Sequence, residues 1–399
     1  MEFDFTSIID RRGTGSLAAE VIPVEGAVVD EGFDRIPMWI ADMNFATVPA
    51  VTRALHERAD HPCFGYFHTS PGYAARIIDW QSRRHGAEGL TEECIGYENG
   101  LLGGLVSAVQ AFSSPGDPVL VHAPTYVGFT RLLTDNGRRI VHSPLRQDEY
   151  GVWRMDYEDM EQKLRTERIH VAILCSPHNP CGRVWERWEL EKAMELYKKY
   201  SCVVIADEIW ADLVLPGNHH IPTQSVSEDA RQRTVAFYAP SKTFNLAGLL
   251  GSYHIIYNPF LRDRVTKVSS LTHYNSSSIF AEVALLAAYT DEGCRWVDEL
   301  CQVLDENVRL AYDFFTRRCR GVTLPRPEGT YLLYLDCTEW CRERGVSLDT
   351  LLRMGVSKGV IWQDGRPFGL NCSIRMNVAL PTARVQEALE RLDKYVFNA

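Results

Sequence analysis

Residues 202–208 read Cys-Val-Val-Ile-Ala-Asp-Glu, and residues 239–248 read Ala-Pro-Ser-Lys-Thr-Phe-Asn-Leu-Ala-Gly. The first segment is an apolar run that ends in two carboxylates, and the second places Lys242 just after another apolar run. A charged group at the tip of a buried strand is costly unless it meets a partner of opposite charge. Because ligands bind at the carboxyl ends of parallel strands, we expect Asp207 and Lys242 to lie close together at that edge of a sheet.

Further apolar runs flank these segments and alternate with helical periodicity. They are rich in Val and Ile on both faces, as is typical of strands that helices cover on each side. The predicted strands are residues 118–122, 139–142, 170–175, 202–207, 234–239 and 251–257. Helical patterns at 156–165 and 186–200 separate some of them. This alternation predicts an α/β fold with a mainly parallel sheet between helices.

The pattern changes after residue 260. A long helical region at 279–318, interrupted near Glu292 and Gly293, is followed by shorter strands and a closing helix. The predicted elements are strands at 330–335, 360–363 and 373–378 and a helix at 382–396.

The chain is long enough for more than one domain, and its patterning suggests where it divides. We predict three parts: an N-terminal segment, residues 1–55, that packs with the small domain; a large α/β domain, residues 56–290; and a small C-terminal α+β domain, residues 291–399.

Composition excludes several functional classes. Hydrophobic residues make up 45% and charged residues 24% of the 399 residues, which is typical of a globular protein. The net charge of −10 argues against broad binding to nucleic acid or to an anionic membrane. The 11 cysteines include no Cys-x-x-Cys pair, so we expect reduced thiols and no metal site. The N-terminus lacks the pattern of a signal peptide and no apolar run could span a bilayer, so we expect a cytoplasmic protein.

A third polar loop follows the strand at 170–175. It reads Ser-Pro-His-Asn-Pro-Cys-Gly over residues 176–182 and adds the amide of Asn179 to the same predicted edge. Taken singly, Ser-Lys is usually a surface pair, Asn-Pro a turn and a strand-end aspartate a helix cap. An amide, a carboxylate and an amine at three strand ends together favour a functional site, in which burial could leave Lys242 nucleophilic.

These motifs identify a resemblance over nearly the whole chain. The chain resembles the fold-type I, pyridoxal-phosphate-dependent aminotransferase superfamily and, within it, the cysteine C–S β-lyase branch of the MalY and PatB kind, which includes cystathionine β-lyases. The block around Lys242 is highly specific for the superfamily, and the segments at 10–16 and 38–43 point to the lyase branch. The remaining matching blocks lie at 64–66, 176–180, 207–209 and 375–377.

The resemblance implies the fold of type I transferases, with a mainly parallel sheet of the seven-stranded type in the large domain. It also implies pyridoxal 5'-phosphate as the cofactor and assigns catalytic roles. Lys242 would hold the cofactor as a Schiff base and later remove the Cα proton of the substrate. Asp207 would keep the pyridinium nitrogen protonated so that the ring accepts electrons. Asn179 would hydrogen-bond the ring 3-oxygen, and Tyr126 would stack on the ring, although a core tyrosine is an equally ordinary reading of that position.

Other residues would hold the phosphate and the substrate. Residues 99–104, which include Gly103 and Gly104, precede a helix whose first N–H groups could cradle an anion, and Ser241 could add a hydroxyl. By resemblance, Tyr66 would reach the phosphate from a partner subunit, which implies a homodimer with shared active sites. Arg375 would clamp the α-carboxylate of an amino-acid substrate.

The resemblance also places Trp39, Asp42 and Tyr66 near the substrate. Four positions depart from the pattern of the branch. Trp210 stands where a histidine or tyrosine is usual, Ala239 where serine is common and Asn44 where aspartate is common. The segment at 272–275, Thr-His-Tyr-Asn, also differs. These departures bear on the substrate more than on the cofactor.

The resemblance favours β-elimination from an L-cysteine S-conjugate such as cystathionine, giving a thiol, pyruvate and ammonia. An aminotransferase is the first alternative, because both reactions begin with the loss of a Cα substituent. An enzyme of secondary metabolism that acts on a bulky cysteine S-conjugate, by elimination or oxidative deamination, is the second. A binding or regulatory protein is a further class, disfavoured because Lys242, Asp207, Asn179 and Arg375 are all present.

Overall fold

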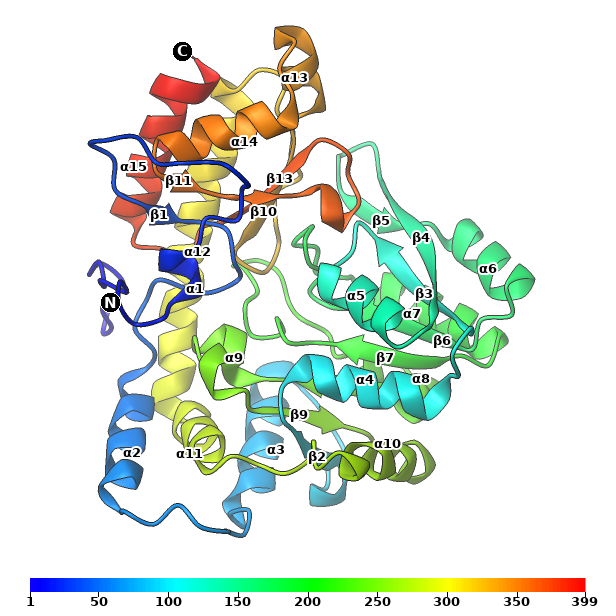
Figure 1. The fold of residues 1–399 in the computed structure, drawn as a ribbon. Coiled ribbons are helices and arrows are strands. Elements are labelled where there is room, and N and C mark those ends of the chain that lie inside the picture. The colour runs from blue at the N-terminus through cyan, green and yellow to red at the C-terminus, as the bar shows by residue number, and fades with distance from the viewer. Residues whose placement is uncertain (399) are drawn as a thin grey trace.

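A computed structural model describes residues 1–398 and contains one large sheet (Figure 1). Its eight strands run in the order β2-β9-β8-β7-β6-β3-β4-β5. Neighbouring strands from β4 to β8 are parallel, whereas β9, β2 and β5 join antiparallel. Their bounds are β2 (Ile95–Glu98), β3 (Pro118–Ala123), β4 (Arg139–Gln147), β5 (Trp153–Met155), β6 (Val171–Cys175), β7 (Val203–Asp207), β8 (Thr234–Tyr238) and β9 (Ser252–Ile255).

The six predicted strands of this sheet are confirmed, most of them to within one or two residues at each end. The sequence did not indicate β2 and β5, which are short edge strands. The strand predicted to end at residue 142 continues to Gln147, and β5 pairs with this extension at Leu145, Arg146 and Gln147. The sheet therefore has eight strands where the fold type suggested seven.

Helices cover both faces of the large sheet because alternate strand residues point to opposite sides. On one face Val121 and Ile205 pack among side chains of α4, α5 and α10. On the other face Leu120 and Val204 pack against α6 and α7, with α8 at the margin. The bounds are α4 (Leu101–Phe112), α5 (Val127–Asp135), α6 (Tyr157–Thr166), α7 (Arg187–Lys199), α8 (Glu228–Arg233) and α10 (Pro259–Leu271).

A smaller sheet lies in the C-terminal part of the chain. In it β13 pairs antiparallel with β10 on one side and with β12 on the other, while β11 pairs in parallel with β1 near the N-terminus. The predicted strand at 360–363 is thus two strands in two sheets. The bounds are β1 (Ile36–Pro37), β10 (Leu332–Asp336), β11 (Val360–Ile361), β12 (Gln363–Asp364) and β13 (Ser373–Asn377).

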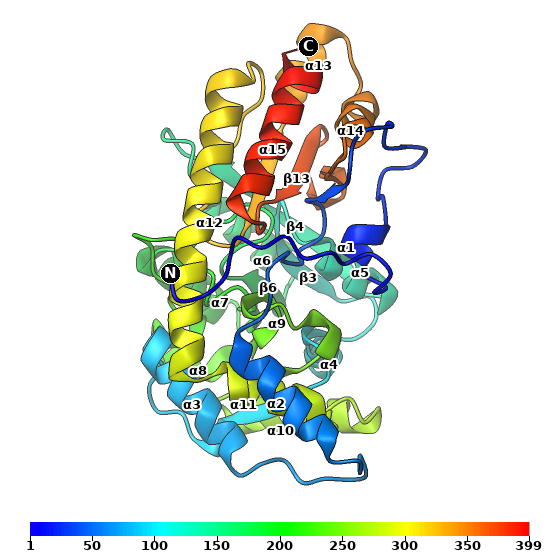
Figure 2. The same ribbon diagram turned by 90° about the vertical axis from the view of Figure 1, so that its left-hand side faces the viewer.

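Long helices border this smaller sheet. Figure 2 shows α12 running along the height of the molecule beside α15. The helix bounds here are α11 (Ile279–Ala288), α12 (Asp291–Arg318), α13 (Thr338–Arg344), α14 (Leu348–Ser357) and α15 (Thr382–Leu392). The predicted break near Glu292 and Gly293 falls earlier, before Asp291, because the Thr290 hydroxyl accepts a bond from Gly293 N at 3.2 Å and caps α12.

The N-terminal segment lies along the molecule without a sheet of its own. Phe5 packs 5.4 Å from Trp296 of α12, measured between ring centroids. Its helices are α1 (Leu17–Glu20) and α2 (Pro49–Asp60), and α3 (Gly72–His85) follows. The division of the chain into three parts stays a prediction. Within residues 1–398, no helix is long and apolar enough to cross a membrane.

Candidate active site

A cavity of about 410 Å³ opens at the carboxyl ends of β6, β7 and β8. Five of the predicted site residues line it, which confirms that the strand-end motifs converge in space. They are Tyr126, Asn179, Asp207, Ser241 and Lys242.

Lys242 lies in α9 (Pro240–Thr243), a single turn directly after β8. Its Nζ donates a hydrogen bond to the carbonyl oxygen of Ala41 at 2.7 Å. Burial lowers the pKa of the amine to about 8; nearby Asp42 and Asp207 oppose this change and Arg375 adds to it. A larger share of the amine is therefore uncharged and nucleophilic at neutral pH than for an exposed lysine.

Asp207 ends β7 and is only 3% exposed. Burial, together with the adjacent Glu208, raises the pKa of its carboxyl to about 7, although the N–H of Ile209 donates to it at 3.1 Å. Within residues 1–398 no Lys, Arg or His forms an ion pair with this carboxylate. A buried carboxylate in that state suits a ligand that brings its own N–H cation.

Glu208, the next residue, is satisfied by protein groups. It accepts bonds from His220 at 2.8 Å, from the Tyr238 hydroxyl at 2.6 Å and from Thr223 N at 2.9 Å. Burial acts to raise the pKa of Glu208, but His220 and the other donors outweigh it and the pKa lies below its usual value.

A third buried carboxylate, Asp212, accepts a hydrogen bond from the residue after the lysine. The Thr243 hydroxyl donates to Asp212 at 3.0 Å. Asp212 also accepts from Trp80 at 3.0 Å and contacts His85 at 2.9 Å, both from α3. Glu208 and Asp212 thus fix the segments that carry Asp207 and Lys242, through hydrogen bonds on the side away from the cavity.

Arg375, on β13, is buried and faces the Asn179 loop. Its guanidinium donates to Asn179 Oδ1 at 3.3 Å and to the carbonyl of Trp39 at 3.3 Å, and lies 4.5 Å from the centroid of Phe368. Burial lowers its pKa to about 10. Its Nε has no partner within the described residues, so the guanidinium keeps a donor for an anionic ligand.

Residues 38–45 form a segment, here called the strap, that passes beside Lys242 and Arg375. Asn245 donates to the carbonyls of Met43 and Phe45, and Asn377 donates to those of Ile40 and Asp42. These four bonds fix the strap to the loop after Lys242 and to β13. The strap thereby presents the two carbonyls that Lys242 and Arg375 contact.

The four residues predicted near the substrate, Arg375, Trp39, Asp42 and Tyr66, all lie outside the cavity lining. The Trp39 indole donates to the Ala18 carbonyl at 3.2 Å, and Asp42 pairs with Arg11 at 2.6 Å. Tyr66 is fully exposed on the loop before α3. In a single chain Tyr66 has no part in the cavity, so its role, like those of Trp39 and Asp42, stays a prediction.

The start of α4 forms one cavity wall. Residues 99–102 line the cavity, and Gly100, at φ +97°, turns the chain into the helix. Gly103 and Gly104 instead face protein. A Cβ on Gly104 would lie 2.6 Å from Phe237 of β8, and one on Gly103 would lie 1.8 Å from the Tyr274 ring. Both glycines allow close packing around the wall, and direct contact of either with a cofactor stays a prediction.

Tyr126 lies directly before α5. Its ring packs so closely over Gly128 that a Cβ there would be 2.3 Å away, and it meets Phe129 edge-on at 5.3 Å. Burial raises the pKa of its phenol, which therefore stays protonated. The position suits ring stacking, which remains a prediction.

Sequence reasoning missed several cavity residues. Trp210 lines the cavity with its ring centroid 6.0 Å from Lys242 Nζ, and it was noted only as a departure. Tyr274, from the segment at 272–275 that also departs from the branch, lines the cavity as well, as does Leu250. Leu250 lies eight residues beyond the lysine, in a left-handed conformation at φ +60°, and no sequence pattern indicated that it reaches the site.

The residues present fit pyridoxal 5'-phosphate. Lys242 offers an amine for its carbonyl, Asp207 a buried carboxylate for its ring N–H, and the start of α4 backbone N–H groups for its phosphate. Arg375 has a donor left for the carboxylate of an amino acid.

Comparison with protein families places this site in context. The family model for aminotransferase class I and II matches residues 36–392. The chain belongs to this family. A curated relative, cystathionine beta-lyase PatB of Bacillus subtilis (strain 168), is 37% identical over 364 residues, which is 90% of this chain and 92% of PatB.

Solved structures agree with this assignment. Cystalysin from Treponema denticola, described as containing a pyridoxal 5'-phosphate cofactor, matches with a TM-score of 0.91 and 30% identity over 99% of this chain and 98% of its own. The PLP-bound C–S lyase from Staphylococcus hominis matches with a TM-score of 0.88 and 29% identity over 98% of each chain. The similarity therefore covers both the large and the small sheet.

Proposed function

We propose that this chain is a pyridoxal-phosphate-dependent carbon–sulfur β-lyase. It converts an L-cysteine S-conjugate, such as cystathionine, and one water into a thiol, pyruvate and ammonium. The observation that carries the proposal is the convergence of Lys242, Asp207 and Asn179 on one cavity, in a chain whose relatives are named as lyases of this kind.

Each residue has a role that follows from its surroundings. Lys242 Nζ would hold the cofactor covalently and would also take the proton from the substrate Cα. A pKa near 8 suits both tasks, because the amine is then readily interconverted between its two protonation states. The buried Asp207 keeps a ring N–H charged by pairing with it.

The substrate is oriented by Arg375 and Asn179. The guanidinium is held by Asn179, the Trp39 carbonyl and the Phe368 ring, so it loses little freedom when it pairs with a carboxylate. The cofactor, when bound, supplies the electron sink for the Cα electron pair. With Cα held beside Lys242 Nζ, a good leaving group on Cβ departs as thiolate.

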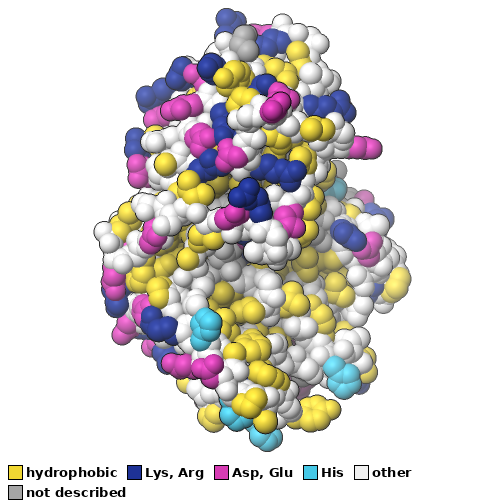
Figure 3. Space-filling model, turned by 60° about the vertical axis from the view of Figure 1, so that its left-hand side comes forward, with side chains coloured by type: hydrophobic (Ala, Val, Ile, Leu, Met, Phe, Trp, Pro, Cys, Tyr) yellow, Lys and Arg dark blue, Asp and Glu magenta, His cyan; other side chains and the backbone are white. Residues whose placement is uncertain are grey.

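The proposal includes a homodimer. At the cavity, Leu102 is 39% exposed and Leu250 is 55% exposed, and Phe64 and Tyr66 are exposed on the loop at residues 61–71. Figure 3 shows hydrophobic side chains spread over the large-domain half of one side of the molecule. A second copy that covers such a surface would bring its own Tyr66 to this cavity. The 11 unpaired thiols suit the reducing cytoplasm, which we propose as the location.

The decisive experiment follows three signals after the purified yellow protein is mixed with L-cystathionine: cofactor absorbance, free thiol and pyruvate. Equal amounts of thiol and pyruvate, with the cofactor spectrum restored at the end, are expected. Conversion of the cofactor to its amine form without thiol would instead identify an aminotransferase. The Lys242→Ala variant is the control and should release neither product.

Shared active sites are tested by mixing subunits. Lys242→Ala and Tyr66→Ala homodimers should each be almost inactive. If Tyr66 serves the partner, a mixed dimer carries one doubly damaged site and one intact site, so an equal mixture should regain about a quarter of the parent activity. No recovery after mixing and refolding would show that Tyr66 serves its own subunit or no site.

A further inference from the structure

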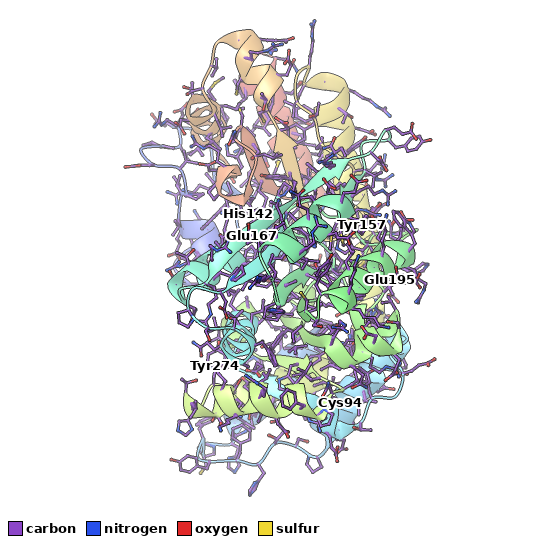
Figure 4. All side chains as sticks on the ribbon, turned by 90° about the vertical axis from the view of Figure 1, so that its right-hand side faces the viewer. Cys94, His142, Tyr157, Glu167, Glu195 and Tyr274 are labelled. Carbon is purple, nitrogen blue, oxygen red and sulfur yellow. The ribbon has the colours of Figure 1, made fainter. Side chains whose placement is uncertain are left out.

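The first turn of α4 is closed on its outer side by one aromatic residue. Tyr274, from the loop between α10 and α11, lies against this helix and lines the cavity (Figure 4). Its ring occupies the space that a side chain at Gly103 would fill, since a Cβ there would lie 1.8 Å from the ring carbon that bears the hydroxyl. The absence of a side chain at Gly103 and the presence of the ring therefore belong together.

The backbone around Tyr274 is fastened to the same wall. Its carbonyl accepts from Asn99 N at 3.0 Å, and its own N–H donates to Ser269 O at 2.9 Å. Farther along the loop, Ser278 N donates to the Tyr97 hydroxyl at 3.4 Å. The loop is thus tied to the connection between β2 and α4, which fixes where the ring lies.

The Tyr274 hydroxyl lies among the helix-start groups that could hold an anion. It donates to the Gly100 carbonyl at 3.4 Å, a long and weak bond. Burial raises the pKa of the phenol, so it remains a neutral donor at physiological pH. A phenol in this position can give up its weak bond and donate to an anion at the start of α4.

The cavity otherwise offers little positive charge for a phosphate. Among its described lining residues, Lys242 is the one cation, and its nitrogen serves the cofactor carbonyl. A phosphate at this wall therefore depends on neutral donors, which are the helix N–H groups and side-chain hydroxyls.

We propose that Tyr274 is a phosphate-binding residue of the cofactor site, with its ring seated on Gly103 and its hydroxyl donating to the phosphate. This proposal depends on the cofactor and not on the reaction that the enzyme catalyses. It therefore stands or falls separately from the proposed lyase activity.

The test measures cofactor binding by full-length protein stripped of cofactor. Pyridoxal 5'-phosphate and pyridoxal, which lacks the phosphate, are titrated in turn and the Schiff-base absorbance is followed. In Tyr274→Phe, the Kd for pyridoxal 5'-phosphate should rise about tenfold, the worth of one hydrogen bond to a charged group, while that for pyridoxal stays within about twofold.

A matched control removes a hydroxyl elsewhere. Tyr257 donates its hydroxyl to the Glu88 carbonyl at 2.8 Å and does not line the cavity, so Tyr257→Phe should bind both compounds as the parent does. Unchanged binding of pyridoxal 5'-phosphate by Tyr274→Phe would overturn the proposal. An equal loss for both compounds would also overturn it, because the residue would then shape the cavity without contacting phosphate.

Discussion

Two neighbouring carboxylates at the end of β7, Asp207 and Glu208, have opposite surroundings. On the cavity side, Asp207 has one backbone donor and a pKa raised to about 7. On the rear side, Glu208 has three donors and a pKa below its usual value. Burial alone therefore does not determine the charge state, because the supply of donors decides it. Glu208, the rear carboxylate, stabilises the fold. Asp207, the front carboxylate, keeps hydrogen-bonding capacity for a ligand.

The comparison predicts its largest effect for the front carboxylate. Asp207→Asn should lower kcat/KM about a thousandfold, or about 4 kcal/mol, because an amide cannot hold a ring N–H charged. Steady-state pyruvate release measures this. Stability should not fall, since the variant removes a buried charge that lacks a partner. A variant that loses activity and stability together would mean that Asp207 is as structural as Glu208.

The rear carboxylate should show the reverse pattern. Glu208→Ala leaves three buried donors, His220, the Tyr238 hydroxyl and Thr223 N, without their acceptor. The free energy of unfolding should therefore fall by about 3 kcal/mol. Urea denaturation of the cofactor-free protein measures this. Glu161, whose ion pair with Lys199 is exposed, is the control: Glu161→Ala should cost less than about 1 kcal/mol. Similar losses for both variants would contradict the assignment of Glu208 to the core.

The pH dependence of the free energy of unfolding gives a further test of this comparison. The Asp207 pKa is raised in the folded cofactor-free protein, so between about pH 4 and pH 7 the folded state binds the proton that the unfolded state has lost. Its contribution therefore makes stability fall as pH rises through this window, by at most about 1.4 kcal/mol per pH unit. The parent should show this slope relative to Asp207→Asn in urea denaturation at several pH values. Parallel curves for the two proteins would show that Asp207 titrates normally.

The smallest expected effect lies beside the lysine. Thr243→Val removes the 3.0 Å bond to Asp212 and should cost about 1 kcal/mol of unfolding free energy. Asp212 keeps Trp80 and His85, which limits the loss. Thermal unfolding measures it. A loss as large as that of Glu208→Ala would show that the two rear carboxylates depend on each other.

Much of the fold could be predicted because its signals are local. Strands such as β6 and β7 are apolar on both faces, and their ends carry Asn179 and Asp207, so parallel-sheet geometry brings the two together. Lys242 follows β8 in the same way. The positions of these residues can be predicted without knowledge of contacts between distant parts of the chain.

The remaining features depend on contacts that no local pattern reveals. Tyr274 reaches α4 through a loop far along the chain, and Gly104 is small because Phe237 of β8 lies against it. The predicted strand at 360–363 divides because Val360 pairs with Ile36 whereas Gln363 pairs with Arg375. Tyr66 lies outside the cavity of a single chain, so its role depends on an assembly that sequence periodicity does not describe.

The strap at residues 38–45 has a consequence for how this site tolerates variation. The two side-chain cations of the site contact carbonyl oxygens of the main chain, at Ala41 and Trp39. Every amino acid carries the same carbonyl, so exchanging the side chain at position 41 leaves the acceptor intact. The strap's path depends instead on Asn245 and Asn377, which grip it from two other parts of the chain. Exchanging the side chain at position 39 or 41 should therefore leave these two acceptors in place, whereas replacing Asn245 or Asn377 should displace them.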